Sequence, residues 1–211
     1  MDTFRYVLAV FTLVSLPFGL LLWYFIHPFA HHWRKLGPAW TYVLLTPVGM
    51  AAALVLFLQR SMLLGTDFGF SYSLAALGLL CVAVGAAIQR QRRRHLTMKI
   101  LSGIPELSGD PGEQKLLTEG IYGRIRHPRY LEALLWVLGY SLIANYLGLY
   151  LLFVLSIPAI FLIVLLEERE LRERFGTEYD EYCRRVPRFV PAWHRDADYE
   201  RTDIGENDNV D

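Results

Sequence analysis

GIYGRIRHPRY, residues 120–130, is a polar stretch that lies between two hydrophobic parts of the chain. A long apolar hairpin follows it, and a second polar block, Glu167-Glu168-Arg169-Glu170, begins where that hairpin ends. A hairpin of two membrane helices returns to the side of the membrane that it left. The two polar blocks are therefore predicted to face each other and to form one site at the membrane surface.

The distribution of charged residues predicts a membrane protein. The chain has 211 residues, of which 54% are hydrophobic and 20% are charged. No Asp, Glu, Lys or Arg occurs in residues 6–26, 39–58, 68–88 or 146–166. Each segment has about 20 residues, the length that crosses a ~30 Å hydrocarbon core as a helix. With the shorter apolar segment 131–145, this predicts an all-α integral membrane protein with about five transmembrane helices.

The chain is expected to form one membrane domain, residues 1–194. The last apolar helix should continue through Glu167 to Phe175 and end at Gly176. A short cytoplasmic helix should begin at Thr177 and close before Val186. Residues 195–211 are acidic and polar without an apolar period, so we expect a disordered tail.

A run of arginines from Arg90 to Arg94 predicts the orientation in the membrane, because cytoplasmic loops carry an excess of Lys and Arg. The N-terminus should then lie outside and the C-terminus in the cytoplasm, and we expect a bacterial inner membrane. Small residues occur at 49–53 and at Gly78 and Gly85, so these two helices are predicted to pack against each other. The oligomeric state stays open.

Two classes of site are not expected. The formal net charge is zero and basic residues do not alternate with aromatic ones, so nothing indicates a nucleic-acid partner. His27, His31 and His32 lie close together, but no Asp, Glu or Cys completes a ligand set, so we expect no metal site.

The residues that flank the hairpin are candidates for chemistry. Arg126 and His127 lead into a helix at Pro128, whose first turn favours a nearby anionic group such as a carboxylate or phosphate. Glu167 and Glu168 should lie opposite, at a depth where an unpaired carboxylate is costly. They either serve function or pair with Arg126 or Arg129 to hold the hairpin closed, and the residues alone leave both readings open.

The motifs, taken in order, resemble the isoprenylcysteine carboxyl methyltransferase family, and the related phospholipid methyltransferases share much of the pattern. The resemblance covers residues 115–191, which would be the catalytic region, while the first three helices agree with the family in number only. The matching positions are Gly120, Tyr122, Arg126-His127-Pro128-Arg129-Tyr130, Glu167-Glu168, Phe175-Gly176, Tyr179, Tyr182 and Val186 to Pro191.

This resemblance implies a membrane enzyme that moves a methyl group from S-adenosylmethionine to a lipid-soluble acceptor, beneath a roof formed by the C-terminal segment. Glu167 would hold the cofactor's ammonium group, His127 its carboxylate, and the rings of Tyr122 and Tyr130 would lie near its sulfonium. Backbone groups would contact the adenosine part, from the residues Gln114, Lys115, Leu116 and Leu117.

Arg126, Glu132 and Glu168 are the catalytic candidates. The family usually has glycine where this chain has Glu132, which could act as a base, bind a cationic acceptor, or pair with Arg129 on the adjacent turn. Eukaryotic members that act on prenylated cysteine carry arginine where this chain has Ile163. A carboxylate acceptor is nucleophilic as it stands, whereas an amine or thiol must first lose a proton.

Membrane sterol and steroid reductases, which use a nicotinamide cofactor, offer an alternative. They share R-H-x-x-Y and a similar C-terminal pattern, which resembles residues 175–187 here. The Glu167-Glu168 pair stands where they tend to carry Arg-Asp, and this favours methyl transfer. A third reading is a membrane protein that binds a ligand without catalysis.

Overall fold

The computed structural model describes residues 1–26, 29–94 and 116–190. Within these ranges the regular elements are helices, apart from an isolated bridge between Asp67 and Tyr146. The helices are α1 (Asp2–Ile26), α2 (Ala30–Leu36), α3 (Pro38–Leu58), α4 (Arg60–Leu64), α5 (Tyr72–Arg93), the 3-10 helix η2 (Gly120–Gly123), α8 (Pro128–Ala144), α9 (Leu147–Phe175) and α10 (Thr177–Arg185). The predicted all-α fold is confirmed. The predicted tail 195–211 and the candidates Gln114 and Lys115 lie outside the described residues.

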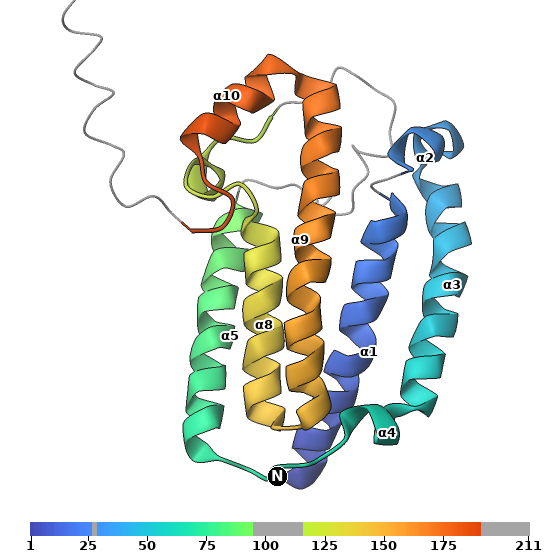
Figure 1. Ribbon diagram of the computed structural model, residues 1–211, viewed down its shortest axis with the longest axis vertical. Coiled ribbons are helices and arrows are strands. Elements are labelled where there is room, and N and C mark those ends of the chain that lie inside the picture. The colour runs from blue at the N-terminus through green and yellow to red at the C-terminus, as the bar shows by residue number, and fades with distance from the viewer. Residues whose placement is uncertain (27–28, 95–115, 191–211) are drawn as a thin grey trace, which may run out of the picture.

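The long helices form a bundle (Figure 1). Four described helices are long and apolar enough to cross a membrane: α1, α3 from Ala39 onward, α5 and α9. Leu79 and Leu80 on α5 and Leu155 on α9 are 59–67% exposed, as expected for side chains that face lipid. The chain is therefore an integral membrane protein. The fifth expected span, α8, has only 17 residues and packs against α1, α5 and α9.

The α8–α9 hairpin forms as predicted. Pro128 occupies the first turn of α8, where its missing N–H costs no hydrogen bond. Asn145 ends the helix in the left-handed conformation, with φ 59° and ψ 49°, which asparagine tolerates better than most residues. The Tyr150 hydroxyl donates to the Asn145 side-chain oxygen at 2.8 Å and fixes the turn. α9 then continues to Phe175, and Gly176 at φ 55° separates it from α10.

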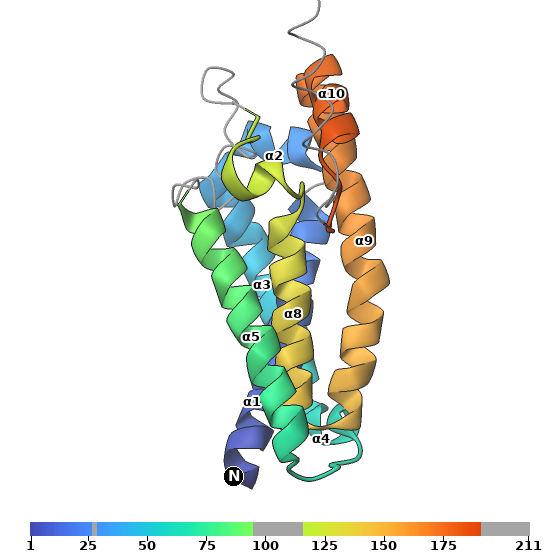
Figure 2. The same cartoon turned by 90° about the vertical axis from the view of Figure 1, so that its left-hand side faces the viewer.

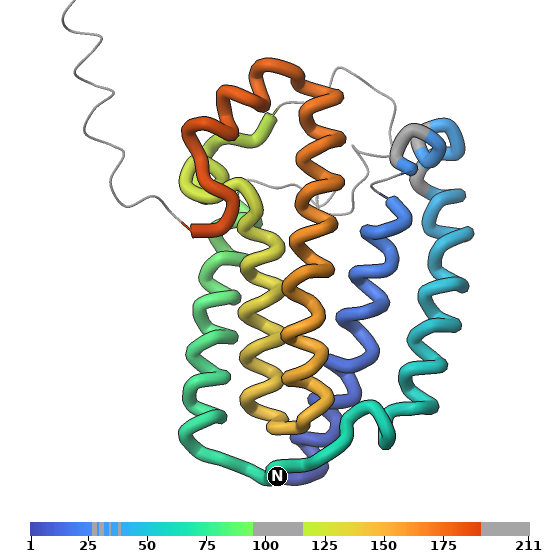
Figure 3. Tube along the Cα trace, viewed as in Figure 1, coloured from blue at the N-terminus to red at the C-terminus, as the bar shows by residue number. Residues whose placement is uncertain are grey.

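Different segments of the chain lie at the two ends of the bundle. The N-terminus lies at one end, whereas α2, the end of α5, η2 and α10 lie at the other (Figures 2 and 3). The four candidate spans and the shorter α8 run between these two ends. The relative placement of the segments is as the charge pattern predicted, while the side of the membrane that each end faces stays a prediction.

Arg5 ties the N-terminal end of the bundle together, which the sequence did not indicate. Its side chain is 1% exposed and forms ion pairs with Asp2 and Asp67. Its Nε also donates to the Ala144 carbonyl at 3.0 Å, and its guanidinium lies over the Tyr146 ring. The charge is thus compensated on every side, so this cluster joins α1 to the turn between α8 and α9.

The prediction that the helix with small residues 49–53 packs against the helix with Gly78 and Gly85 is wrong. The helix with Gly78 and Gly85 is α5, and it packs along α8 rather than against α3. A Cβ placed on Gly78 would lie 2.6 Å from the Gly139 carbonyl oxygen, so the two glycines let the α5 and α8 backbones touch. Gly49 of α3 instead faces the Phe18 ring of α1. Composition indicated the close approaches, but which helices meet depends on the tertiary arrangement of the bundle.

Gly139→Ala is expected to lower the free energy of unfolding by about 1–3 kcal/mol, as overpacking of a filled interior does. The added methyl would lie 2.7 Å from the Gly78 carbonyl oxygen and 2.8 Å from the Val82 side chain. Thermal unfolding in detergent measures the change. Gly19→Ala is the matched control, because a Cβ at Gly19 meets nothing within 4 Å. Equal melting temperatures for both variants would contradict the tight contact between α5 and α8.

Candidate active site

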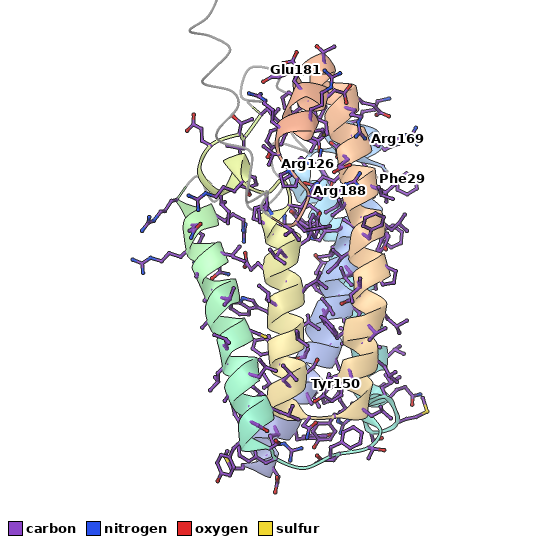
Figure 4. The ribbon with its side chains drawn as sticks, turned by 60° about the vertical axis from the view of Figure 1, so that its left-hand side comes forward. Phe29, Arg126, Tyr150, Arg169, Glu181 and Arg188 are labelled. Atoms are coloured by element: carbon purple, nitrogen blue, oxygen red, sulfur yellow. The ribbon has the colours of Figure 1, made fainter. Side chains whose placement is uncertain are left out.

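The carboxylate of Glu168 is the centre of the polar end of the hairpin. Its side chain is fully buried, and Arg188 holds it with two hydrogen bonds, from Nε at 2.9 Å and from Nη2 at 2.8 Å. Arg126 approaches the same carboxylate at 3.1 Å and His127 Nε2 at 3.2 Å. Figure 4 shows Arg126 and Arg188 close together beside α9, near the start of α8. Such a surrounded carboxylate is stabilised as an anion and has no free side for a substrate.

The segment after α10 carries Arg188 to this position. Its backbone pairs with the residues that lead into α8: the Arg126 N–H donates to the Pro187 carbonyl at 2.9 Å, and the His127 N–H donates to the Arg188 carbonyl at 3.0 Å. Further back, the Tyr182 hydroxyl of α10 donates to the Tyr122 carbonyl at 2.7 Å. These bonds fix the C-terminal segment on the first polar block, and the contacts of Arg126 and His127 with Glu168 join the two polar blocks, as predicted.

Glu167 differs from its neighbour because one of its oxygens has no partner. Its Oε2 is buried and accepts no hydrogen bond from the described residues. Nδ1 of His127 lies 3.7 Å from this oxygen, too far for a hydrogen bond. The ionised carboxylate of Glu168 accepts a hydrogen bond from His127 Nε2, so in a neutral imidazole Nδ1 carries no proton and is also an acceptor. Two acceptors therefore face each other, and a donor between them would satisfy both.

Tyr122 lies among the charges of this region. Burial raises the pKa of its phenol to about 12. The positive charges of Arg92 and Arg129 lower this pKa, and the negative charges of Glu167 and Glu132 raise it. The phenol therefore keeps its proton at neutral pH and can donate a hydrogen bond, but it cannot act as a base there.

Glu132 does not pair with Arg129, and this expectation was wrong. Its Oε2 accepts from Arg92 Nε at 3.0 Å and its Oε1 from the Gln89 amide at 3.0 Å, both on α5. Glu132 faces α5 because α8 packs along that helix. The guanidinium of Arg129 lies instead over the Trp23 ring of α1, 3.8 Å from its centre. A carboxylate already paired with arginine is a poor base, so Glu132 is better explained as a structural link between α5 and α8.

Two other predicted residues, Tyr130 and Leu116, lie mainly in the packed interior. Tyr130 is 6% exposed and packs with Ile160, Ile163 and Val164 of α9, although its ring centre lies only 5.9 Å from that of His127. Leu116 is buried against α10, and the neighbouring Leu117 is half-buried. The structure thus brings together Tyr122, Arg126, His127, Glu167 and Glu168, as predicted.

Comparison with known proteins now decides the family. The family described as "Phospholipid methyltransferase" matches residues 73–178, half of the chain. The chain belongs to this family. Curated relatives carry a methyltransferase name as well. "Protein-S-isoprenylcysteine O-methyltransferase B" of Arabidopsis thaliana is 38% identical over 85 residues, which are 36% of this chain and 40% of that protein.

A second relative matches a longer part of the chain. "Protein-S-isoprenylcysteine O-methyltransferase" of Schizosaccharomyces pombe is 31% identical over 132 residues, which are 59% of this chain and 52% of that protein. The chain thus spans about half or less of the length of these curated relatives. No solved structure matches it. The family and the relatives carry methyltransferase names, so the reductase alternative is not supported.

The match to the phospholipid methyltransferase family begins in α5, earlier than the motifs indicated, and α5 contributes two partners of Glu132 that sequence reasoning missed. Arg92 and Gln89 hold Glu132, and Arg92 lies in the basic run that was used only to predict orientation. Arg188 was also missed, although the motif Val186 to Pro191 contained it. An arginine inside a motif shared with the family was the available signal in that case.

Proposed function

We propose that this chain transfers a methyl group from S-adenosylmethionine to a lipid-soluble acceptor at the cytoplasmic face of the membrane. Membership of the phospholipid methyltransferase family and the names of the relatives support this function. The observation that carries it is the buried Glu167 Oε2, which has no hydrogen-bond partner among the described residues and has His127 Nδ1 at 3.7 Å, at the joined polar blocks. An alkylammonium group is the donor that such an oxygen is suited to bind.

The residues present fit this cofactor. Glu167 would bind its amino group, because that carboxylate has a buried oxygen without a partner. Arg126 would bind its carboxylate, since Nε and Nη1 of Arg126 are buried and lack hydrogen-bond partners among the described residues. In this proposal Arg126 binds the cofactor's carboxylate, a role for which the resemblance implied His127. Tyr122 would supply an aromatic face and a neutral hydroxyl near the sulfonium.

Methyl transfer by a direct displacement makes modest demands on the protein. The cofactor, when bound, supplies a methyl group that is already activated by the positive sulfur. The chain has to align the acceptor, keep water out and hold the cofactor's charged ends. The segment of residues 186–190 shields the site from the aqueous side, through its bonds to Arg126 and His127. Glu168 contributes by fixing Arg126, His127 and Arg188, which makes it a positioning residue.

The wider setting belongs to the same proposal. Residues 1–194 would act as one domain, with the N-terminus outside and the C-terminus in the cytoplasm of a bacterial cell. The acceptor would enter from the bilayer, because α8 and α9 present apolar side chains on the membrane side of the polar site. No role for nucleic acid or metal is proposed.

Calorimetric titration of the purified protein in detergent tests the proposal. We expect binding of S-adenosylhomocysteine, the product form of the cofactor, with a Kd on the order of micromolar. NADPH is expected to give no heat of binding. Incubation with labelled S-adenosylmethionine and a total membrane lipid extract should then place the label in a lipid that mass spectrometry identifies. Binding of NADPH without S-adenosylhomocysteine would overturn the proposal.

A further inference from the structure

We propose that Phe189 binds the apolar part of the methyl acceptor. The C-terminal segment of residues 186–190 would then form a wall of the acceptor site in addition to covering the cofactor residues. Because this role presupposes methyl transfer, it rests on the proposed function, and it adds to that function a residue for the acceptor.

The backbone of this segment determines which of its side chains turn toward the helices. The carbonyls of Pro187 and Arg188 accept hydrogen bonds, at 2.9 and 3.0 Å, from the two N–H groups that lead into α8. The next side chain, Phe189, is half-buried and packs against the membrane helices. Val190 after it is 74% exposed. The segment therefore turns Phe189 toward the helices and Val190 away from them.

Phe189 contacts both a cofactor residue and an apolar cluster. Its ring centre lies 6.1 Å from that of His127, and Nδ1 of His127 lies 3.7 Å from the Glu167 oxygen that the proposed function assigns to the cofactor. Phe189 also packs against the cluster around Tyr130 and Ile160, to which α1, α8 and α9 contribute. Among the described residues, it is the member of this cluster that comes from outside these three helices.

The acceptor of a methyl group has to satisfy two conditions at this place. Its reactive group has to lie beside the cofactor, and its apolar part has to stay out of water. Two rings of the apolar cluster approach His127, Tyr130 at 5.9 Å and Phe189 at 6.1 Å between ring centres. Tyr130 is only 6% exposed, whereas Phe189 is half-buried and keeps surface that a ligand can contact. Phe189 is therefore the ring of the two that an acceptor can contact.

The same segment also borders the surface that faces lipid. The guanidinium of Arg188, which lies beside α9 in Figure 4, is over the Phe161 ring, 5.8 Å from its centre. Phe161 is a residue of α9 and is 44% exposed, as expected for a side chain in contact with acyl chains. The segment thus connects the lipid-facing surface of α9, at Arg188, with the cofactor residue His127, at Phe189.

A purely structural role for Phe189 has a different consequence. If the ring only held the segment in place, its loss would loosen the cover of the cofactor residues and weaken cofactor binding. However, the segment is also held by the backbone bonds of Pro187 and Arg188 and by two hydrogen bonds from Arg188 to Glu168. Loss of the ring should therefore spare cofactor binding and weaken acceptor binding.

Labelled methyl transfer by the full-length protein in mixed micelles tests the inference. The probe is the total membrane lipid extract, titrated at saturating S-adenosylmethionine. Phe189→Ala is expected to raise the half-saturating lipid concentration about tenfold, because one large apolar contact is lost. The rate at saturating lipid should stay within about twofold of the wild type. Phe189→Leu should recover most of the lipid affinity, and both variants should bind S-adenosylhomocysteine with a Kd within about twofold of the wild type.

Phe11→Ala is the matched control, because Phe11 is a phenylalanine of α1 that is 59% exposed and has no part in the proposed site. It should leave the half-saturating lipid concentration unchanged. An equal concentration for Phe189→Ala and Phe11→Ala would overturn the inference. So would a loss of S-adenosylhomocysteine affinity in Phe189→Ala, because the ring would then act by holding the segment. A wild type that neither binds S-adenosylhomocysteine nor transfers label would instead overturn the proposed function, and this inference with it.

Discussion

Glu167→Gln is expected to weaken binding of S-adenosylhomocysteine about a hundredfold, as loss of a charged hydrogen-bonding partner in a buried site does. The substitution keeps the shape of the side chain and removes its charge. Glu167 Oε2 has no partner among the described residues, so the folded protein loses little when the charge disappears. The cost falls on the ligand's ammonium group. His127→Ala is expected to act in the same direction, since it removes the second acceptor, and calorimetric titration measures both.

The matched control for this prediction lies on the same helix. Glu173 is an exposed glutamate that pairs with Arg169, which points away from the bundle (Figure 4). Glu173→Gln should change neither the cofactor affinity nor the melting temperature appreciably, since exposed ion pairs contribute little. If Glu167→Gln bound S-adenosylhomocysteine as tightly as Glu173→Gln, Glu167 would have no part in the cofactor site.

Glu168→Gln is expected to have its main effect on stability, with a loss of about 3–5 kcal/mol in the free energy of unfolding. The neutral amide would leave Arg126 and Arg188 without the carboxylate between them. Arg126 is only 8% exposed at its side chain, so its charge cannot turn to water without disturbing the segment that Arg188 anchors. Thermal unfolding in detergent measures the loss, and limited proteolysis should show earlier cleavage near residues 186–190.

A double variant tests whether the loss of stability in Glu168→Gln comes from a buried arginine left without its carboxylate. Glu168→Gln combined with Arg126→Gln removes one charge of each sign and should be more stable than Glu168→Gln alone, because the buried unpaired cation is gone. If the single variant unfolded at the wild-type temperature, the carboxylate of Glu168 would not be holding the C-terminal segment in place.

The family resemblance pointed to Glu167 for the cofactor, but the spacing of the residues could not tell which of the two neighbouring glutamates is enclosed by arginines. Consecutive residues of an α-helix point about 100° apart, so two adjacent carboxylates face different surroundings. Only the docking of Arg188, twenty residues further along the chain, shows that Glu168 is the enclosed one. The same applies to Glu132, where the helix that packs alongside α8 determined the partner. The spacing along the helix suggested Arg129 as the partner of Glu132, but tertiary packing places Arg92 there.

The sequence by itself determined the helices, the hairpin and the meeting of its two polar ends. Unbroken apolar segments, Pro128, Asn145 and Gly176 set where helices begin and end, because these signals act within a few residues. The tertiary structure alone decided which charges neutralise each other. That choice depends on contacts between α5, α8, α9 and the C-terminal segment, which lie far apart along the chain. It leaves Glu167 Oε2 without a hydrogen-bond partner among the described residues, and the proposed function assigns this oxygen to the cofactor.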